Sequence, residues 1–133
     1  MLTNNTLWTT ELVEECICVA SQVERMLPPS DMKNSRWIII RAWQALWWDE
    51  LDDGITNADF IVTDEHRKIW EMVVLHWLPM IDSNKDLKIL WWRACGLGWS
   101  KIGRRLGLER HTIANRHLRA TRELVKALNR KKI

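Results

Sequence analysis

The sequence predicts an all-α fold, and three observations predict it. Apolar residues recur mainly at the spacing of an amphipathic helix, strand-like alternation is scarce, and turn signals are few, with 5 Gly and 3 Pro in the chain. A chain of 133 residues has room for one compact domain or two small ones. We therefore expect helices throughout, arranged as a Trp-rich N-terminal subdomain and a C-terminal group of three helices.

The charge distribution sets the predicted boundary between these parts. The formal net charge is only +3, but residues 1–82 contain 6 Lys/Arg and 14 Asp/Glu, whereas residues 83–133 contain 14 and 3. A basic module on an otherwise acidic chain points to an anionic partner. We expect an acidic helical subdomain over 1–82 and a basic domain over 83–133.

The first predicted helix runs from about Thr10 to Leu27. Its apolar residues form one broad stripe, and three glutamates fall in its first turns, where the helix dipole favours anions. Pro28 and Pro29 end this helix because residues before a proline avoid the helical conformation.

A second helix is predicted from about Lys33 to Leu51, and it is apolar on nearly every face. Such a helix is either central to a core or half of an interface. Neighbouring residues of a helix diverge by about 100°, so the two members of a Trp doublet face different surroundings. We expect one member of Trp47-Trp48 and one of Trp91-Trp92 to face a partner subunit, with Trp43, Trp47 and Trp48 as the candidate residues of a homodimer interface.

A loop is expected over 52–62, where Gly54 and several Asx residues act as turn signals. The third helix follows from about Asp64 to Leu78, and Pro79 closes it. Ser83 and Asp86 match a capping box, with Asp in place of the usual Glu, which opens a helix that runs to Cys95.

Two more helices are predicted, Trp99 to Leu106 and about Arg110 to Asn129, separated by three residues. A short helix, a Gly-containing turn and a longer helix are typical of a DNA-binding helix-turn-helix. Gly103 is small where the helices approach, and Gly107 suits a left-handed turn. Four apolar residues pin the two helices at a steep angle: Ile102, Leu106, Leu108 and Ile113.

The outward face of the last helix is polar and basic. We expect Arg110, His111 and Asn115 to contact DNA bases, because Arg and Asn pair with guanine and adenine edges. The expected phosphate contacts, which fix the register without reading sequence, are Lys101, Arg104, Arg105, Thr112, Arg116, Arg119 and Arg122, continued by Lys126 and 130–132. Residues 99–133 hold 11 Lys/Arg against 2 Asp/Glu, whereas a merely solvated face usually mixes signs.

The run Ile102-Gly103-x-x-Leu106-Gly107-Leu108-x-Arg110-x-x-Ile113 resembles the region-4 helix-turn-helix of bacterial sigma factors, over about the last 50 residues. The resemblance implies base contacts by Arg110, His111 and Asn115. Three positions depart from that family: Glu109 replaces the usual Ser or Thr cap, and His111 and Asn115 replace the common Glu and Gln. The DNA sequence preference therefore does not carry over.

More of the chain resembles an uncharacterised helix-turn-helix family of bacterial and phage genomes. The matching features are W-T-x-E-x-V-E-E at 8–15, the pair Leu27-Pro28 and W-x-x-I-x-R-R-L-G at 99–107. This resemblance indicates that both halves are inherited as one unit.

Several other classes are not expected. The four histidines, His66, His76, His111 and His117, form no HExxH motif, no GxSxG accompanies them, and glycine is too rare for a phosphate loop, so we predict no enzyme and no small-molecule substrate. Asp49, Asp52 and Asp53 lack EF-hand spacing. We also expect no cofactor.

The three cysteines, Cys16, Cys18 and Cys95, show no zinc-type spacing and are expected as free core thiols in a reducing cytosol. The N-terminus resembles no export signal, and no apolar run approaches the roughly 18 residues of a membrane helix. A cytoplasmic protein without membrane contact is the expected result.

These features together predict a helix-turn-helix transcription regulator that binds double-stranded DNA, as a homodimer. Two alternatives remain open. The basic domain could dock on RNA polymerase or another regulator, or the chain could be a ring-forming, small-terminase-like subunit of phage DNA packaging.

Overall fold

The computed structural model describes residues 7–26 and 61–130, and in these ranges the protein is all-α, without a strand. The helices are α1 (Thr10–Met26), α3 (Asp64–Glu71), α4 (Asn84–Ala94), α5 (Trp99–Leu106) and α6 (Arg110–Arg130), with two short helical turns after α3. The predicted helix over 33–51, which carries the expected interface residues Trp43, Trp47 and Trp48, lies outside the described residues.

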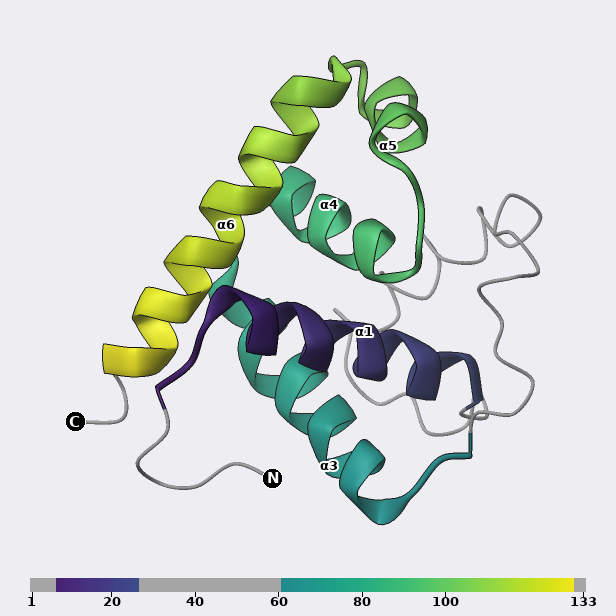
Figure 1. Ribbon diagram of the computed structural model, residues 1–133, viewed down its shortest axis with the longest axis vertical. Helices are drawn as coiled ribbons and strands as arrows, with labels where there is room; N and C mark the ends of the chain where they lie inside the picture. Colours follow the sequence, from purple (N-terminus) through teal and green to yellow (C-terminus); the bar gives the residue numbers. More distant parts are fainter. Residues whose placement is uncertain (1–6, 27–60, 131–133) are drawn as a thin grey trace.

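The helices form two groups around a shared core. Helices α1 and α3 lie side by side, α4 and α5 form the other end of the molecule, and α6 runs along one side of both groups (Figure 1). The stripe predicted for the first helix is confirmed at Val13, Ala20 and Val23, which are fully buried. Helix α1 also packs on α4 and α6, so the acidic and basic parts share one apolar core.

The segment predicted as one helix to Leu78 changes its winding. Helix α3 ends at Glu71, a π-helical stretch covers Met72–Trp77, and a 3-10 turn covers Leu78–Met80. The N–H of Leu78 donates to the carbonyl of Val73, five residues back. Helical winding continues to Met80, two residues past the predicted end at Leu78, because a proline without an N–H is tolerated in the first turn of the 3-10 segment.

Tryptophan forms much of the core. Trp8 packs edge-on against Trp77, with 4.9 Å between ring centroids. Trp91 and Trp92 are 0% and 5% exposed. The expectation that one of this doublet faces a partner subunit is wrong, because neighbours within the same chain cover both rings.

A reciprocal pair of hydrogen bonds ties the start of the chain to the end of α6. The backbone N–H of Trp8 donates to the Asn129 side-chain oxygen at 2.8 Å, and the Asn129 side-chain nitrogen donates to the carbonyl of Trp8 at 3.1 Å. This pair spans the boundary expected between the acidic and basic domains and holds α6 against the N-terminal part.

Candidate nucleic-acid interface

The basic end of the molecule is built from α4, α5 and α6. Ser83 caps α4 by accepting a hydrogen bond from the Asp86 N–H at 3.3 Å, as the sequence predicts. The Asp86 carboxylate accepts from Nε of Arg116 on α6, at 2.9 Å. In a capping box the Asp86 carboxylate would bond to the backbone N–H of Ser83. Here it joins α4 to α6 instead.

The connection from α5 to α6 depends on two glycines, Gly103 within α5 and Gly107 in the turn. Gly107 adopts the left-handed conformation with φ 69° and ψ 32°, which favours glycine. A Cβ placed on Gly103 would overlap the carbonyl oxygen of Leu108. The N–H of Leu108 in turn donates to the Gly103 carbonyl at 2.9 Å. Both glycine roles predicted from the sequence are confirmed.

One face of α6 is packed into the core. Ile113 is fully buried, opposite Ile102 of α5, and Leu106 and Leu108 are half-buried against the same core, as expected. The buried residues of α6 are Ile113, His117, Ala120, Thr121, Leu124 and Leu128. Every residue on this face is fixed by packing and is unavailable to a macromolecular partner.

His117 is the one titratable side chain on the buried face of α6. Its ring packs edge-on against Trp99 with centroids 5.1 Å apart. Burial, together with the nearby positive charge of Arg93, lowers its pKa to about 4. The imidazole is therefore neutral at pH 7.

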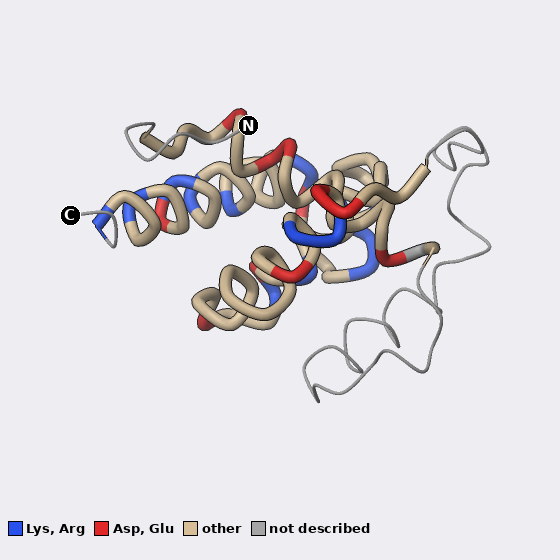
Figure 2. The backbone as a smooth tube through the Cα atoms, turned by 90° about the horizontal axis from the view of Figure 1, so that it is seen from below, with Lys and Arg blue, Asp and Glu red and all other residues tan. Residues whose placement is uncertain are grey.

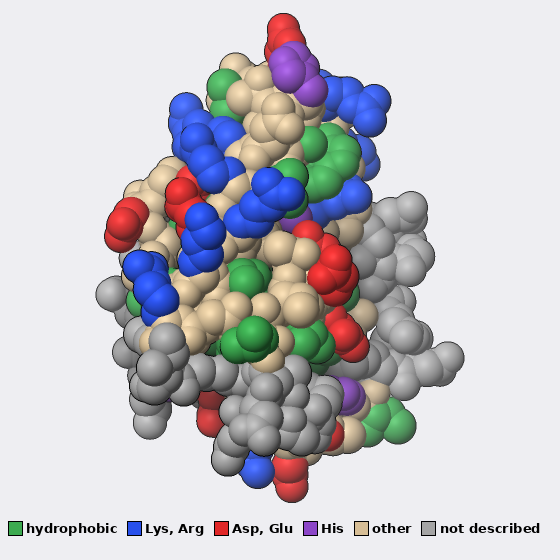
Figure 3. All heavy atoms as spheres, turned by 60° about the vertical axis from the view of Figure 1, so that its left-hand side comes forward, with side chains coloured by type: hydrophobic (Ala, Val, Ile, Leu, Met, Phe, Trp, Pro, Cys, Tyr) green, Lys and Arg blue, Asp and Glu red, His purple; other side chains and the backbone are tan. Residues whose placement is uncertain are grey.

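The opposite face of α6 is exposed and basic. Figure 3 shows Lys and Arg side chains gathered on the side where α6 comes forward, and Figure 2 shows basic residues recurring along its length. The three expected base contacts, Arg110, His111 and Asn115, are all exposed, and so are five of the expected phosphate contacts: Lys101, Arg104, Arg105, Arg119 and Arg122.

Two expected phosphate contacts lie in a different setting. Thr112 is half-buried. Arg116 is also half-buried, and its side chain is 26% exposed where it pairs with Asp86. Arg116 is thus held by a carboxylate of α4, an arrangement that the sequence spacing does not reveal.

A carboxylate stands at the tip of this surface. Glu109 directly precedes α6, and its Oε2 lies 3.2 Å from Nδ1 of His111, with both side chains more than two-thirds exposed. The carbonyl of Glu109 accepts from the N–H of Ile113 and so forms the first turn of α6. The one feature of the sequence that points to the pairing of Glu109 with His111 is their separation by two positions.

Within 7–26 and 61–130, no three His, Cys, Asp or Glu side chains are arranged to hold a metal ion. Cys16 and Cys95 are buried, as expected, Cys18 is half-buried, and none of the three forms a disulfide. Burial together with Glu15 raises the pKa of Cys16 to about 11. No helix in the same ranges has the length and apolar character needed to cross a membrane.

The family described as a domain of unknown function, DUF6362, matches residues 25–124, three quarters of the chain. No curated protein and no solved structure matches the chain.

Proposed function

We propose that this chain, which belongs to the DUF6362 family, binds double-stranded DNA through the exposed face of α6 and regulates transcription. The observation that carries the proposal is the division of α6 into a buried apolar face and an exposed basic face, next to a tight turn from α5. This is the arrangement by which a helix-turn-helix presents the start of its second helix to the major groove.

The side chains divide into two roles. Arg110, His111 and Asn115, in the first turns of α6, are proposed to contact base edges, because Arg and Asn make bidentate pairs with guanine and adenine. The exposed basic side chains of α5 and of later turns of α6 are proposed to hold phosphates. Arg116 is assigned a positioning role, since its guanidinium pairs with Asp86 at 2.9 Å.

Salt dependence tests the proposal. Binding to a labelled duplex is measured by fluorescence anisotropy over a range of salt concentrations. Affinity falls linearly on a log–log plot, with a slope of about −0.9 for each phosphate neutralised. Arg122→Gln is expected to make the slope shallower by about 0.9. Lys68→Gln on α3 removes the same charge from an exposed position away from this face and is expected to leave the slope unchanged.

Two results would contradict the proposal. A wild-type affinity that does not depend on salt would show that binding does not involve neutralisation of phosphates. Equal effects of Arg122→Gln and Lys68→Gln would show that net charge matters and the α6 face does not. Under either result, docking of this face on RNA polymerase or another regulator would become the better account.

We further propose that the protein binds as a homodimer. Two-fold operators place recognition helices about 34 Å apart, which requires two copies. Light scattering is expected to give twice the chain mass of 15.8 kDa. A monomer would contradict the dimer, and a ring of many copies would favour the DNA-packaging alternative.

A further inference from the structure

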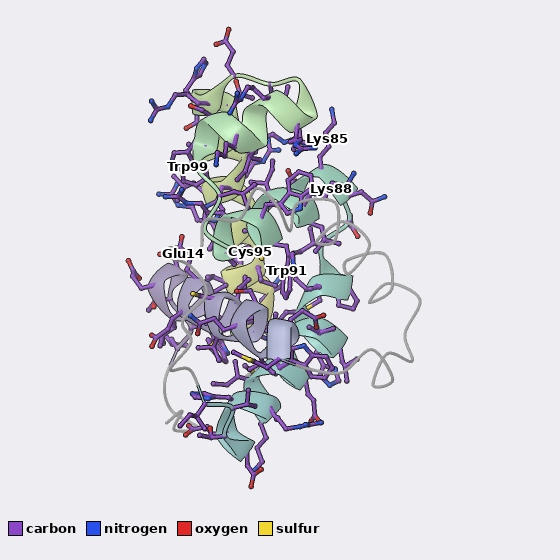
Figure 4. The ribbon with its side chains drawn as sticks, turned by 90° about the vertical axis from the view of Figure 1, so that its right-hand side faces the viewer. Glu14, Lys85, Lys88, Trp91, Cys95 and Trp99 are labelled. Carbon is purple, nitrogen blue, oxygen red and sulfur yellow. The ribbon has the colours of Figure 1, made fainter. Side chains whose placement is uncertain are left out.

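A cavity lies between the acidic and basic parts of the molecule, beside α6. Its volume is about 410 Å³, and its walls come from α1, α4, α5 and α6. Figure 4 shows Glu14 of α1 and Trp99 of α5 on the same side of the molecule, and both line this cavity. Ligand pockets span about 300–1,000 Å³, so this cavity suits a small molecule.

Half of the residues that line the cavity are aliphatic. Ile17 of α1, Leu90 and Ala94 of α4 and Leu118 of α6 contribute to it. Leu118 is 41% exposed, so part of its side chain is open to a molecule in the cavity. Ala114 directly precedes Asn115 and Leu118 lies three residues after it, so a molecule in the cavity would touch the same turns of α6 that carry this proposed base contact.

Arg93 brings a positive charge to the cavity. Its guanidinium carbon lies 4.0 Å from the centroid of the Trp99 ring, and Nη1 donates to the carbonyl of Leu97 at 3.2 Å. In the part of the chain that the structure describes, no carboxylate pairs with Arg93. The remaining N–H groups can therefore donate to an anion.

Glu14 and His117 each place a hydrogen-bond acceptor at the cavity, and the two side chains do not bond to each other. Oε1 of Glu14 lies 4.0 Å from Nδ1 of His117, which is beyond hydrogen-bond distance. His117 is neutral at pH 7 because its pKa is about 4, so Nδ1 can accept a hydrogen bond when the proton resides on Nε2. An ammonium group has several N–H donors and is small enough to bond to both.

We propose that this cavity binds a free aliphatic α-amino acid, with its ammonium group between Glu14 and His117 and its carboxylate on Arg93. The side chain of the ligand lies against Ile17, Leu90 and Leu118. A zwitterion fits because the cavity offers one negative and one positive group, and an aliphatic side chain fits because most of the remaining wall is apolar. This proposal is independent of the proposed DNA binding.

Titration calorimetry of the full chain tests the proposal with three probes of equal hydrocarbon content. L-Leucine has both charged groups, 3-methylbutylamine lacks the carboxylate, and 4-methylpentanoate lacks the ammonium group. Leucine is expected to bind at least about tenfold more tightly than either analogue, since each loses a charge-assisted hydrogen bond. The proposal would be overturned if all three probes bound equally. It would also be overturned if neither L-leucine nor L-valine bound at millimolar concentration.

Matched variants locate the site. Glu14→Gln is expected to weaken leucine binding at least about fivefold, while Glu15→Gln, on the next residue and outside the cavity, leaves it unchanged. Arg93→Gln is expected to weaken leucine but not 3-methylbutylamine. If Arg93→Gln unfolds the chain because the packing on Trp99 is lost, Glu14→Gln, which is half exposed, still decides the question. Unchanged leucine binding by Glu14→Gln would overturn the assignment.

Discussion

The two faces of α6 differ in almost every physical property. The inner face is apolar, buried and packed on α1, α4 and α5, and its only titratable group, His117, is kept neutral. The outer face is exposed and carries arginine, histidine, asparagine and lysine. Side chains on the inner face stabilise the fold, whereas the exposed side chains of the outer face add little to it.

This division separates folding from recognition within one helix. Substitutions on the buried side should change the free energy of unfolding, because they create cavities, overlaps or buried unpaired groups. Substitutions on the exposed side should change DNA affinity and leave stability nearly constant. Each of the following experiments tests whether the two sides are as independent as their environments indicate.

The largest effect is expected at the contact between α5 and the turn. Gly103→Ala should lower the free energy of unfolding by about 3 kcal/mol, because the new Cβ overlaps the backbone of Leu108. Gly98→Ala is a matched control, since a Cβ there meets nothing within 4 Å, and it should cost less than about 1 kcal/mol. Urea denaturation measures both, and equal losses would contradict the tight approach at Gly103.

The buried histidine predicts a pH-dependent stability. The pKa of His117 is about 4 in the folded chain and near 6.5 when unfolded, so the unfolded chain binds more protons between these values. The free energy of unfolding therefore has its full value above pH 6.5. It decreases as the pH falls towards 4, by roughly 3 kcal/mol in total. Denaturation at several pH values should show this slope, which His117→Gln should reduce. A slope that the variant leaves unchanged would contradict the burial of a neutral imidazole.

On the outer face the expected effect is on specificity. Arg110→Ala and Asn115→Ala should reduce discrimination between specific and random duplex DNA by about 1 to 3 kcal/mol, since they remove the proposed base contacts. Arg130→Ala, near the end of α6, should weaken both kinds of DNA alike. Competition titrations separate these outcomes. If all three variants affect both DNA types equally, the placement of the base contacts is wrong.

The smallest effect is expected where the two faces meet. The Asp86–Arg116 pair is partly exposed, and a double-mutant cycle with Asp86→Asn and Arg116→Gln should give a coupling energy of about 1 kcal/mol. Additive losses, with no coupling, would indicate that Arg116 is available to a ligand and that its assignment to positioning is wrong.

The sequence predicted the basic end of the fold closely, for identifiable reasons. Gly103 and Gly107 mark one close approach and one left-handed turn, and the apolar spacing on either side fixes the bounds of α5 and α6. Contacts between distant segments could not be predicted. The Asp86–Arg116 pair spans 30 residues and the Trp8–Asn129 pair spans 121, and nothing local in the sequence indicates that either is brought together.

Elsewhere, tertiary packing overrode the local pattern. Apolar spacing does not distinguish an α-helix from the π-helical stretch over Met72–Trp77, because both bury a similar stripe. One member of Trp91-Trp92 would have to face a partner only if α4 had a single neighbour. In the fold, α4 is covered on several sides by the same chain, and both rings are buried.

Selection of bound sequences from a random duplex pool shows whether the outer face of α6 recognises a DNA sequence. If the outer face of α6 reads DNA, the wild-type chain should enrich a defined motif, and Asn115→Ala should lose the preference at one position of that motif while keeping the others. Recognition through this face would be contradicted if the wild-type chain enriched no motif. It would also be contradicted if Asn115→Ala and Arg110→Ala enriched the same motif as the wild-type chain.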